Sequence, residues 1–472
     1  MFGIFRGTGF NILTAISPVG MVMVAFLFLV GSTFVSPDTY QVVLKEPNLM
    51  HMNGKLIGFI SLTCLAFLAG FFLMGGNSGN NRLLRSGAAG ENVNKLYHVY
   101  PLLAAAALNL YSVMIMLKNT PGLIGFVLSA NGNTAKQVID TTGGMAGAQP
   151  LLIAMIWWAM GKHMVVFPNL KTSAAKLSAA LIGGGLCLAI LISVLKVARY
   201  EVIPLLVGSL IVYLVISARR GTLNAKKLTA IGLGCGAAVV AIFIAFSLLR
   251  GNTSEGVEQN LYGYGPTAVN HLAAVIDGRL QFPYAGTGTY TFEFLSRAPF
   301  LYKFINFQAL LGLPDPVMVF ESEFDATRQA GLNAAYNWVT ALGYYYMDLG
   351  PWYYPFFVLM GALSCLFWKH ALKGQTLGLV MYPFTAGTIL LWMTSNAFTR
   401  AQLMTYLMMV VALAIYDQLF SRRARNPLQE SMAARGAVNP SPRPQMDLRR
   451  PALRPQGRPQ TRQQPPGPET RR

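Results

Sequence analysis

The side chains best suited to acid–base chemistry gather in residues 250–350, the one long polar stretch of an otherwise apolar chain. It contains nine of the 18 Asp and Glu residues but only five Lys and Arg, so its net charge is −4 while the whole chain carries +19. A carboxylate or imidazole within reach of a hydroxyl group can act as its general base. The candidates are Glu255, His271, Glu293 and Asp348, with a structural role as the alternative for the histidine.

Arginines form a second candidate group, because a guanidinium is permanently charged and presents a fixed fork of donors that fits a diphosphate. Arg199 stands beside Tyr200 and Glu201 in a short turn that we expect on the outer side of a membrane, where an arginine without a use is disfavoured. We therefore count Arg199 as catalytic; its alternative is pairing with Glu201 or with lipid headgroups. The other candidates for binding phosphate are Arg279, Arg297, Arg328 and Arg400.

Aromatic residues crowd positions 335–355. Tyr336 and Trp338 precede the next apolar run and are candidates for stacking on sugar rings. Residues 352–354 begin that run and are typical of the aromatic belt at a membrane surface.

The sequence predicts no metal site and no cofactor. Glu321, Glu323 and Asp325 have an alternate spacing that a divalent cation can use, but they lack an EF-hand register, so we favour a solvated loop. The four cysteines lie in apolar runs without CxxC spacing, which argues against a zinc site or a disulfide framework.

The composition requires a framework that is mostly in contact with lipid. Charged residues make up 12% of the chain and hydrophobic residues 53%, so we expect an all-α polytopic membrane protein. A helix needs about 20 apolar residues to cross the hydrocarbon core. Ten such spans are predicted, near residues 14–35, 56–75, 97–117, 150–168, 177–197, 202–218, 228–249, 351–370, 376–396 and 401–420.

Alternate connections between these spans are basic, which predicts their orientation. Short cytoplasmic loops collect Lys and Arg, so we expect both termini in the cytoplasm and residues 250–350 outside. Within this external loop, Pro266–Ile276 begins with proline and repeats apolar residues at helical spacing, which predicts a short helix. Residues 294–313 mix apolar and basic side chains, which predicts an interfacial amphipathic helix.

We therefore divide the chain into a transmembrane domain, residues 1–421, and a cytoplasmic tail, residues 422–472. The tail is rich in Arg and Pro and cannot bury a core, so we expect it to be disordered. Its charge favours contact with anionic lipid headgroups. No folded basic module accompanies it, so nucleic acid is not an expected partner.

From Tyr262 to Gly361 the order of features resembles that of bacterial oligosaccharide repeat unit polymerases of the Wzy type. The resemblance rests on YGYGPTAVNHL, GTGTYTFEFL and YNWVTALGYYYMDLG. An outer arginine that precedes a helix in the family is matched by Arg199, although Ala198 replaces the usual serine. The third segment matches the family pattern at Asn337, Thr340, Tyr346, Asp348 and Gly350.

The resemblance implies a GT-C-like membrane glycosyltransferase of the bacterial inner membrane that acts in O-antigen or exopolysaccharide biosynthesis. Such a polymerase moves a glycan from polyprenyl diphosphate to the non-reducing-end hydroxyl of another lipid-linked unit, without a metal. It further implies that Asn337 and Tyr346 contact substrate, and that a flippase and a chain-length regulator of the same pathway are partners. An O-antigen-type ligase, or a polysaccharide flippase or other transporter, remains the alternative.

Overall fold

A computed structural model describes residues 12–76, 95–128, 148–167, 170–196, 199–249, 259, 262–263, 265–296, 304–394 and 396–436. Throughout these ranges the regular elements are helices and none is a strand, which confirms the all-α class. The short elements among them are α1 (Ile12–Ala15), α3 (Pro37–Leu44), α7 (Leu123–Leu128), η3 (Gly350–Trp352) and η4 (Ala397–Thr399).

Seven helices in the described part of the chain are long and apolar enough to cross a membrane, which confirms a polytopic membrane protein. In three of them the apolar stretch covers only part of a longer helix, and in a fourth it joins two helices. They are α4 (Gly54–Leu73), α6 (Val99–Asn119), α10 (Ser173–Leu195), α11 (Arg199–Arg219), α12 (Ala225–Leu249), the segment Ala341–Leu372 with α18 (Ala341–Leu349) and α19 (Tyr353–Leu372), and α21 (Gln402–Gly436).

The other three expected spans also form helices: α2 (Pro18–Ser32), α9 (Ala148–Val166) and α20 (Thr376–Leu390). Helices α2 and α20 have only 15 residues each, so a total of ten crossings remains a prediction. Helix α20 is buried along nearly its whole length, so its surroundings are protein rather than lipid. In α9, the charged Lys162 lies 2.7 Å from Asp417 of α21, which neutralises it near the end of an apolar helix.

The tightest helix contact joins α4 and α19, and glycine makes it possible. A Cβ atom on Gly70 would lie 1.8 Å from the carbonyl oxygen of Val358, and one on Gly361 would lie 1.9 Å from that of Phe67. Small residues let two backbones approach in a membrane, where dispersion contacts replace the hydrophobic driving force. The pair of glycines therefore fixes how α19 lies against α4.

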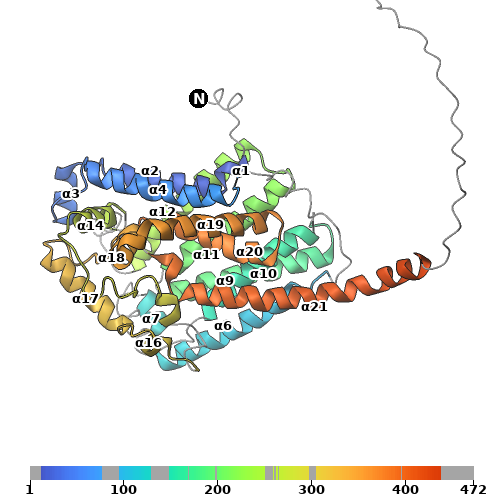
Figure 1. Cartoon of the computed structure of the whole chain (residues 1–472). Coiled ribbons are helices and arrows are strands. Elements are labelled where there is room, and N and C mark those ends of the chain that lie inside the picture. The colour runs from blue at the N-terminus through green and yellow to red at the C-terminus, as the bar shows by residue number, and fades with distance from the viewer. Residues whose placement is uncertain are drawn as a thin grey trace, which may run out of the picture. The chain divides into compact units, whose positions relative to one another are not determined.

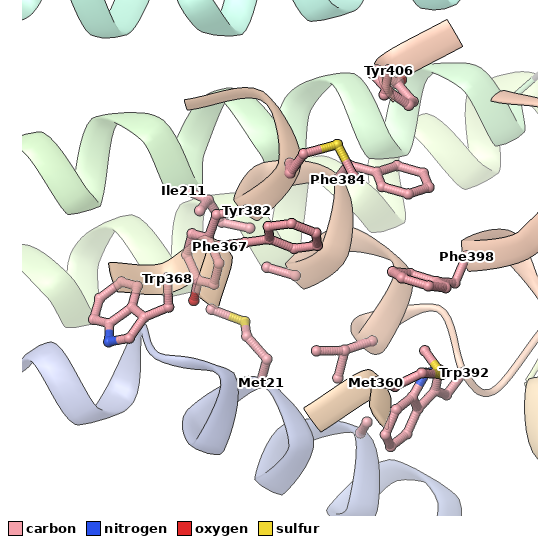
Figure 2. Close-up of a cluster of buried hydrophobic side chains, with 14 of the residues drawn as sticks. Met21, Ile211, Met360, Phe367, Trp368, Tyr382, Phe384, Trp392, Phe398 and Tyr406 are labelled. Carbon is pink, nitrogen blue, oxygen red and sulfur yellow. The ribbon is translucent and has the colours of Figure 1, made fainter. Parts of the chain in front are cut away.

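An aromatic core fills the space between α2, α11, α19, α20 and α21 (Figure 2). The rings of Trp368 and Tyr382 are 4.9 Å apart between centroids, and those of Phe384 and Tyr406 are 4.7 Å apart. Such pairs add to the energy of burial when they are tilted or stacked with an offset. This core holds the ends of α19, α20 and α21 together, and with them the connections that carry polar residues.

Residues 250–350, the loop that we expect to be external, contain α14 (Pro266–Ile276), α15 (Glu293–Ser296), α16 (Phe307–Leu310) and α17 (Pro316–Gln329). The predicted helix Pro266–Ile276 is confirmed at both ends. The single helix expected over residues 294–313 is wrong, because Asn306 caps a new helix at Phe307 after a non-helical stretch. Figure 1 shows α3 and α14 beside each other at one end of α2 and α4.

Helix α21 does not end near Phe420, as predicted, but continues to Gly436. Residues 421–436 contain four Arg and three Ala, which are good helix formers, and a single proline, Pro427, whereas the Pro-rich composition begins at Pro440. The chain divides into compact units after Ala424, close to the expected boundary at 421. Residues 437–472, most of the predicted disordered tail, lie outside the described residues.

Candidate functional site

One buried glutamate that the sequence analysis did not consider joins three parts of the chain. Glu46 lies between α3 and α4 and is 3% exposed. Its Oε1 accepts hydrogen bonds from the Tyr40 hydroxyl and from Asn270 Nδ2 at 2.9 Å. Its Oε2 accepts from the Asn333 backbone amide at 2.7 Å and lies 3.2 Å from His271 Nε2. Both carboxylate oxygens are therefore fully used.

His271 completes this arrangement from α14. Its Nδ1 lies 3.1 Å from the carbonyl oxygen of Trp338, and its Nε2 faces the carboxylate of Glu46. Both partners are hydrogen-bond acceptors, so each ring nitrogen lies where an N–H group would donate. Burial raises the pKa of Glu46, but the hydrogen bond and charge of His271, with Tyr40 and Asn333, outweigh it, and the pKa is lowered.

This pairing removes His271 from the candidates for a general base. The ring is fully buried and neither nitrogen is open to a substrate. The adjacent Asn270 strengthens the same joint, because its Oδ1 accepts from the backbone amide of Leu49 at 2.6 Å and from that of Met50 at 3.2 Å. The structure thus places His271 in a scaffold that fastens α14 to the connection between α3 and α4.

Asp348 is also committed to the scaffold. Its Oδ1 accepts from the amide of Gly288 at 2.9 Å, and its Oδ2 accepts from the amide and the hydroxyl of Thr291 at 2.9 and 2.7 Å. A carboxylate that receives three donors from one loop has no free direction toward a substrate hydroxyl. The geometry supports a role in shaping the loop at 288–291.

A different environment surrounds Glu323 on α17. The side chain is 6% exposed, and its Oε2 accepts one hydrogen bond, from Asn337 Nδ2 at 2.9 Å. Its charged neighbours are Arg400, which favours the ionised form, and Glu293, which opposes it. Burial is the largest effect and raises the pKa of Glu323 to about 8. We call Glu293, Glu323 and Arg400 the outer charge cluster.

The connection between α20 and α21 brings Arg400 to this cluster. Arg400 follows η4 and is half-buried, with Nε 3.5 Å from Asn396 Oδ1. Asn396 Nδ2 and the Thr399 hydroxyl both donate to the carbonyl oxygen of Tyr290, at 3.0 and 2.7 Å. These bonds hold the connection against the segment that leads into Glu293. Residues separated by more than 100 positions therefore share one charged site.

The sequence analysis found three of the residues in and around this cluster: Glu293, Asn337 and Arg400. Glu323 was not among the candidates, because the acidic residues of 321–325 were expected to form one solvated loop. In the structure they lie on helix α17, where Glu321 and Asp325 are exposed and Glu323 points inward. Residues two apart on a helix face different directions, and a helical pattern in this stretch was the signal that could have separated them.

The remaining arginine candidates do not join the cluster in the described structure. Arg279 is exposed, and Arg328 is 71% exposed with an ion pair of 3.1 Å to Asp325 in the preceding turn. Arg199 begins α11, but its side chain lies outside what the structure describes. Arg297 and Glu255 also lie outside the described residues.

The aromatic candidates are divided between buried and exposed positions. Tyr336 is buried, and its hydroxyl donates to the carbonyl oxygen of Gln259 at 3.1 Å. Trp338 is half-buried, and its carbonyl oxygen holds His271. Tyr346 is 39% exposed and packs edge-on against Phe59. Of the three, Tyr346 presents the most ring surface to the outside.

A small cavity of about 40 Å³ lies among α9, α11, α20 and α21. Its polar lining comes from Gln149, Glu201 and Gln402, and the rest is mostly apolar. Glu201 pairs with Lys196 at 3.4 Å. Glu201 follows the predicted site at Arg199 by two residues, and Gln402 follows Arg400 by two. Arg199 lies in the first turn of helix α11 and not in the short turn predicted from the sequence, and this end of α11 borders the same cavity as the start of α21.

In the part of the chain that the structure describes, no group of three or more His, Cys, Asp or Glu residues could hold a metal ion. The chemistry that the site offers comes from one guanidinium, two carboxyl groups and the hydroxyl and amide groups around them. Comparison with protein-family models, curated proteins and solved structures finds no match to this chain.

Proposed function

We propose that this protein is a membrane glycosyltransferase that polymerises oligosaccharide repeat units carried on polyprenyl diphosphate. The observation that carries the proposal is the outer charge cluster, in which Arg400 lies among the charges of Glu293 and Glu323. A guanidinium can hold the diphosphate leaving group while a carboxylate accepts the proton of a sugar hydroxyl. The resemblance in residues 262–361 supports the same reaction.

The proposed roles follow from charge and position. Arg400 binds the diphosphate and stabilises the charge that develops when the glycan leaves, as a preorganised cation does in acyl and phosphoryl transfer. Arg199, on the neighbouring outer turn, supplies a second cation. Tyr346, partly exposed at the start of the last membrane segments, offers a ring surface for the glycan.

This proposal places the protein in the bacterial inner membrane, with both termini in the cytoplasm and the cluster outside. Labelling tests the orientation: a cysteine in place of the exposed Thr287 should react with an impermeant thiol reagent from outside. One in place of the exposed Thr222 should not. Cys187 and Cys235 are not buried and would also react with the thiol reagent, so both are first replaced by serine. Reversed labelling contradicts the orientation.

Polymerisation can be measured with purified full-length protein and a synthetic lipid diphosphate repeat unit, by formation of a ladder on a gel. We expect ladders from the wild-type protein and a loss of about tenfold or more in both Arg400→Lys and Arg400→Ala, the alanine variant being worse. Arg328→Ala is the matched control because this arginine is exposed and paired only on its own helix. Transfer of glycan to a different acceptor, without a ladder, would identify a ligase instead.

A further inference from the structure

Glu323 differs from the other carboxylates of the external loop in how little of its hydrogen-bonding capacity is used. Asn337 donates to Oε2, and Oε1 accepts no hydrogen bond of normal geometry in the described part of the chain, although the Tyr290 hydroxyl lies close enough to interact with the carboxylate. Asp348 has three donors, and Asp315, which is exposed, caps the start of α17 through Val317. Glu321 is exposed to solvent on the same helix. Among these four carboxylates, Glu323 alone is buried with one oxygen that lacks a normal hydrogen bond.

A second observation points to a group that is absent from this arrangement. The Tyr290 side chain is 4% exposed and faces Glu323, yet its hydroxyl completes no hydrogen bond of normal geometry with any described residue. A buried hydroxyl without a partner destabilises the fold. A substrate hydroxyl placed between Tyr290 and Glu323 could satisfy both side chains.

We propose that Glu323 is the general base that removes the proton from the acceptor sugar hydroxyl, with Asn337 holding the carboxylate in position. This assignment rests on the proposed polymerase function and selects one residue within its site. It separates the roles of the two acids in the outer charge cluster. Glu293 is half-buried and tunes the charge of the site, whereas Glu323 is directed at the acceptor.

The step is balanced in atoms and charge. Glu323 carboxylate takes the hydroxyl proton and becomes a carboxylic acid, while the acceptor oxygen forms a bond to the anomeric carbon of the donor glycan. The bond from that carbon to the diphosphate oxygen breaks, and its electron pair leaves with polyprenyl diphosphate. Arg400 faces both Glu323 and the developing negative charge, so one cation serves the ionised base before transfer and the leaving group after it.

A base in this environment gives the reaction a defined dependence on pH. The titratable and charged groups that face Glu323 are Arg400, Tyr290, Glu293 and Tyr344. The charge of Arg400 favours the ionised form of Glu323, and the charge of Glu293 opposes it. Since burial raises the pKa of Glu323 to about 8, we expect kcat/KM to rise with pH up to about that value.

The test compares Glu323→Gln with Glu321→Gln, its exposed neighbour on α17, in the ladder assay on full-length protein. Glu323→Gln should lower the rate by about 100-fold or more, as for loss of a general base, while binding of the lipid-linked donor is retained. Glu321→Gln should leave the rate unchanged. Wild-type ladder formation by Glu323→Gln would overturn the assignment. An inactive wild-type protein would instead refute the proposed function.

Asn337→Ala provides a second measurement that a merely structural role would not affect. The amide stabilises the ionised form of Glu323, so its removal should move the pH midpoint of kcat/KM to higher pH. The maximal rate at alkaline pH should recover in part. An unshifted midpoint would contradict the assignment, and this result decides the question if Glu323→Gln is not recovered as folded protein.

Discussion

Glu46 and Glu323 are both buried glutamates, yet their surroundings have opposite effects on the pKa of the carboxyl group. Glu46 is contacted by four hydrogen-bonding groups, among them the His271 ring, and its pKa is lowered. Glu323 accepts one hydrogen bond of normal geometry, from a neutral amide, and its pKa is raised to about 8. The first is stabilised as an anion and the second is held close to the point where it can exchange a proton at neutral pH.

The number of donors to a carboxylate distinguishes a structural acid from a catalytic one more clearly than its burial or its residue type does. A carboxylate with every oxygen occupied gains stability from its surroundings but has no direction left for a substrate. One that is buried with a free oxygen lowers stability, and natural proteins retain such groups mainly at functional sites. Asp348 belongs with Glu46 by this criterion, although its place in a recognisable motif made it a catalytic candidate.

The largest effect on stability is expected from Glu46→Ala. It leaves the His271 ring buried without its partner and removes the acceptor of Asn333 and Asn270, which should cost about 3–5 kcal/mol. Thermal unfolding in detergent measures the loss. In the double variant Glu46→Ala/His271→Ala the cost should be well below the sum of the single costs. Additive costs would show that the two groups are not a pair.

The pH dependence of stability should have opposite signs at the two glutamates. The folded-state pKa of Glu46 is lowered, so its contribution is present above the ordinary value of 4.5 and is lost as pH falls through the folded value. The pKa of Glu323 is raised to about 8, so stability falls as the pH rises from 4.5 to 8, by at most about 1.4 kcal/mol per pH unit.

Unfolding of the wild-type protein and of Glu323→Gln across this range provides the measurement. The glutamine variant should lose the slope between pH 4.5 and 8 and be as stable as the wild type or more so at pH 8. A variant with the same slope as the wild type would show that Glu323 is ionised at its ordinary pKa, and the contrast with Glu46 would disappear.

An intermediate effect is expected from Asp348→Ala. Loss of the acceptor for Gly288 and Thr291 leaves their donors unsatisfied and should cost about 1–3 kcal/mol. The loop that leads to Tyr290 should loosen, and polymerisation should weaken through poorer positioning. Its pH midpoint should stay that of the wild type, unlike that of Asn337→Ala. A shifted midpoint would return Asp348 to the acid–base chemistry.

The smallest effect is expected from Arg328→Ala. The ion pair with Asp325 is 71% and 66% exposed at its two ends, and such surface pairs contribute about 0–1 kcal/mol. Unfolding and ladder formation should both match the wild type closely. A clear loss of polymer at normal protein level would mean that Arg328 reaches the substrate, and would enlarge the site beyond the outer charge cluster.

The sequence by itself determined the membrane class, the helical framework and the short helix Pro266–Ile276 at both of its ends. These features depend on local properties, namely the length of apolar runs, helical spacing and a proline at the first turn. It also indicated Arg400 and Glu293, because charged residues are uncommon in such a chain, and the family resemblance indicated Asn337.

Only the tertiary structure decided which acids stabilise the fold and which keep an oxygen available for proton transfer. Three of the four partners of Glu46 lie more than 200 residues away, at Asn270, His271 and Asn333, and no local pattern connects them to it. Burial of Glu323 likewise depends on how α17 lies against Asn337, Tyr290 and the turn at Arg400. The charge of a carboxyl group is set by the solvent and donors that remote segments remove or supply, so its role appears only after folding.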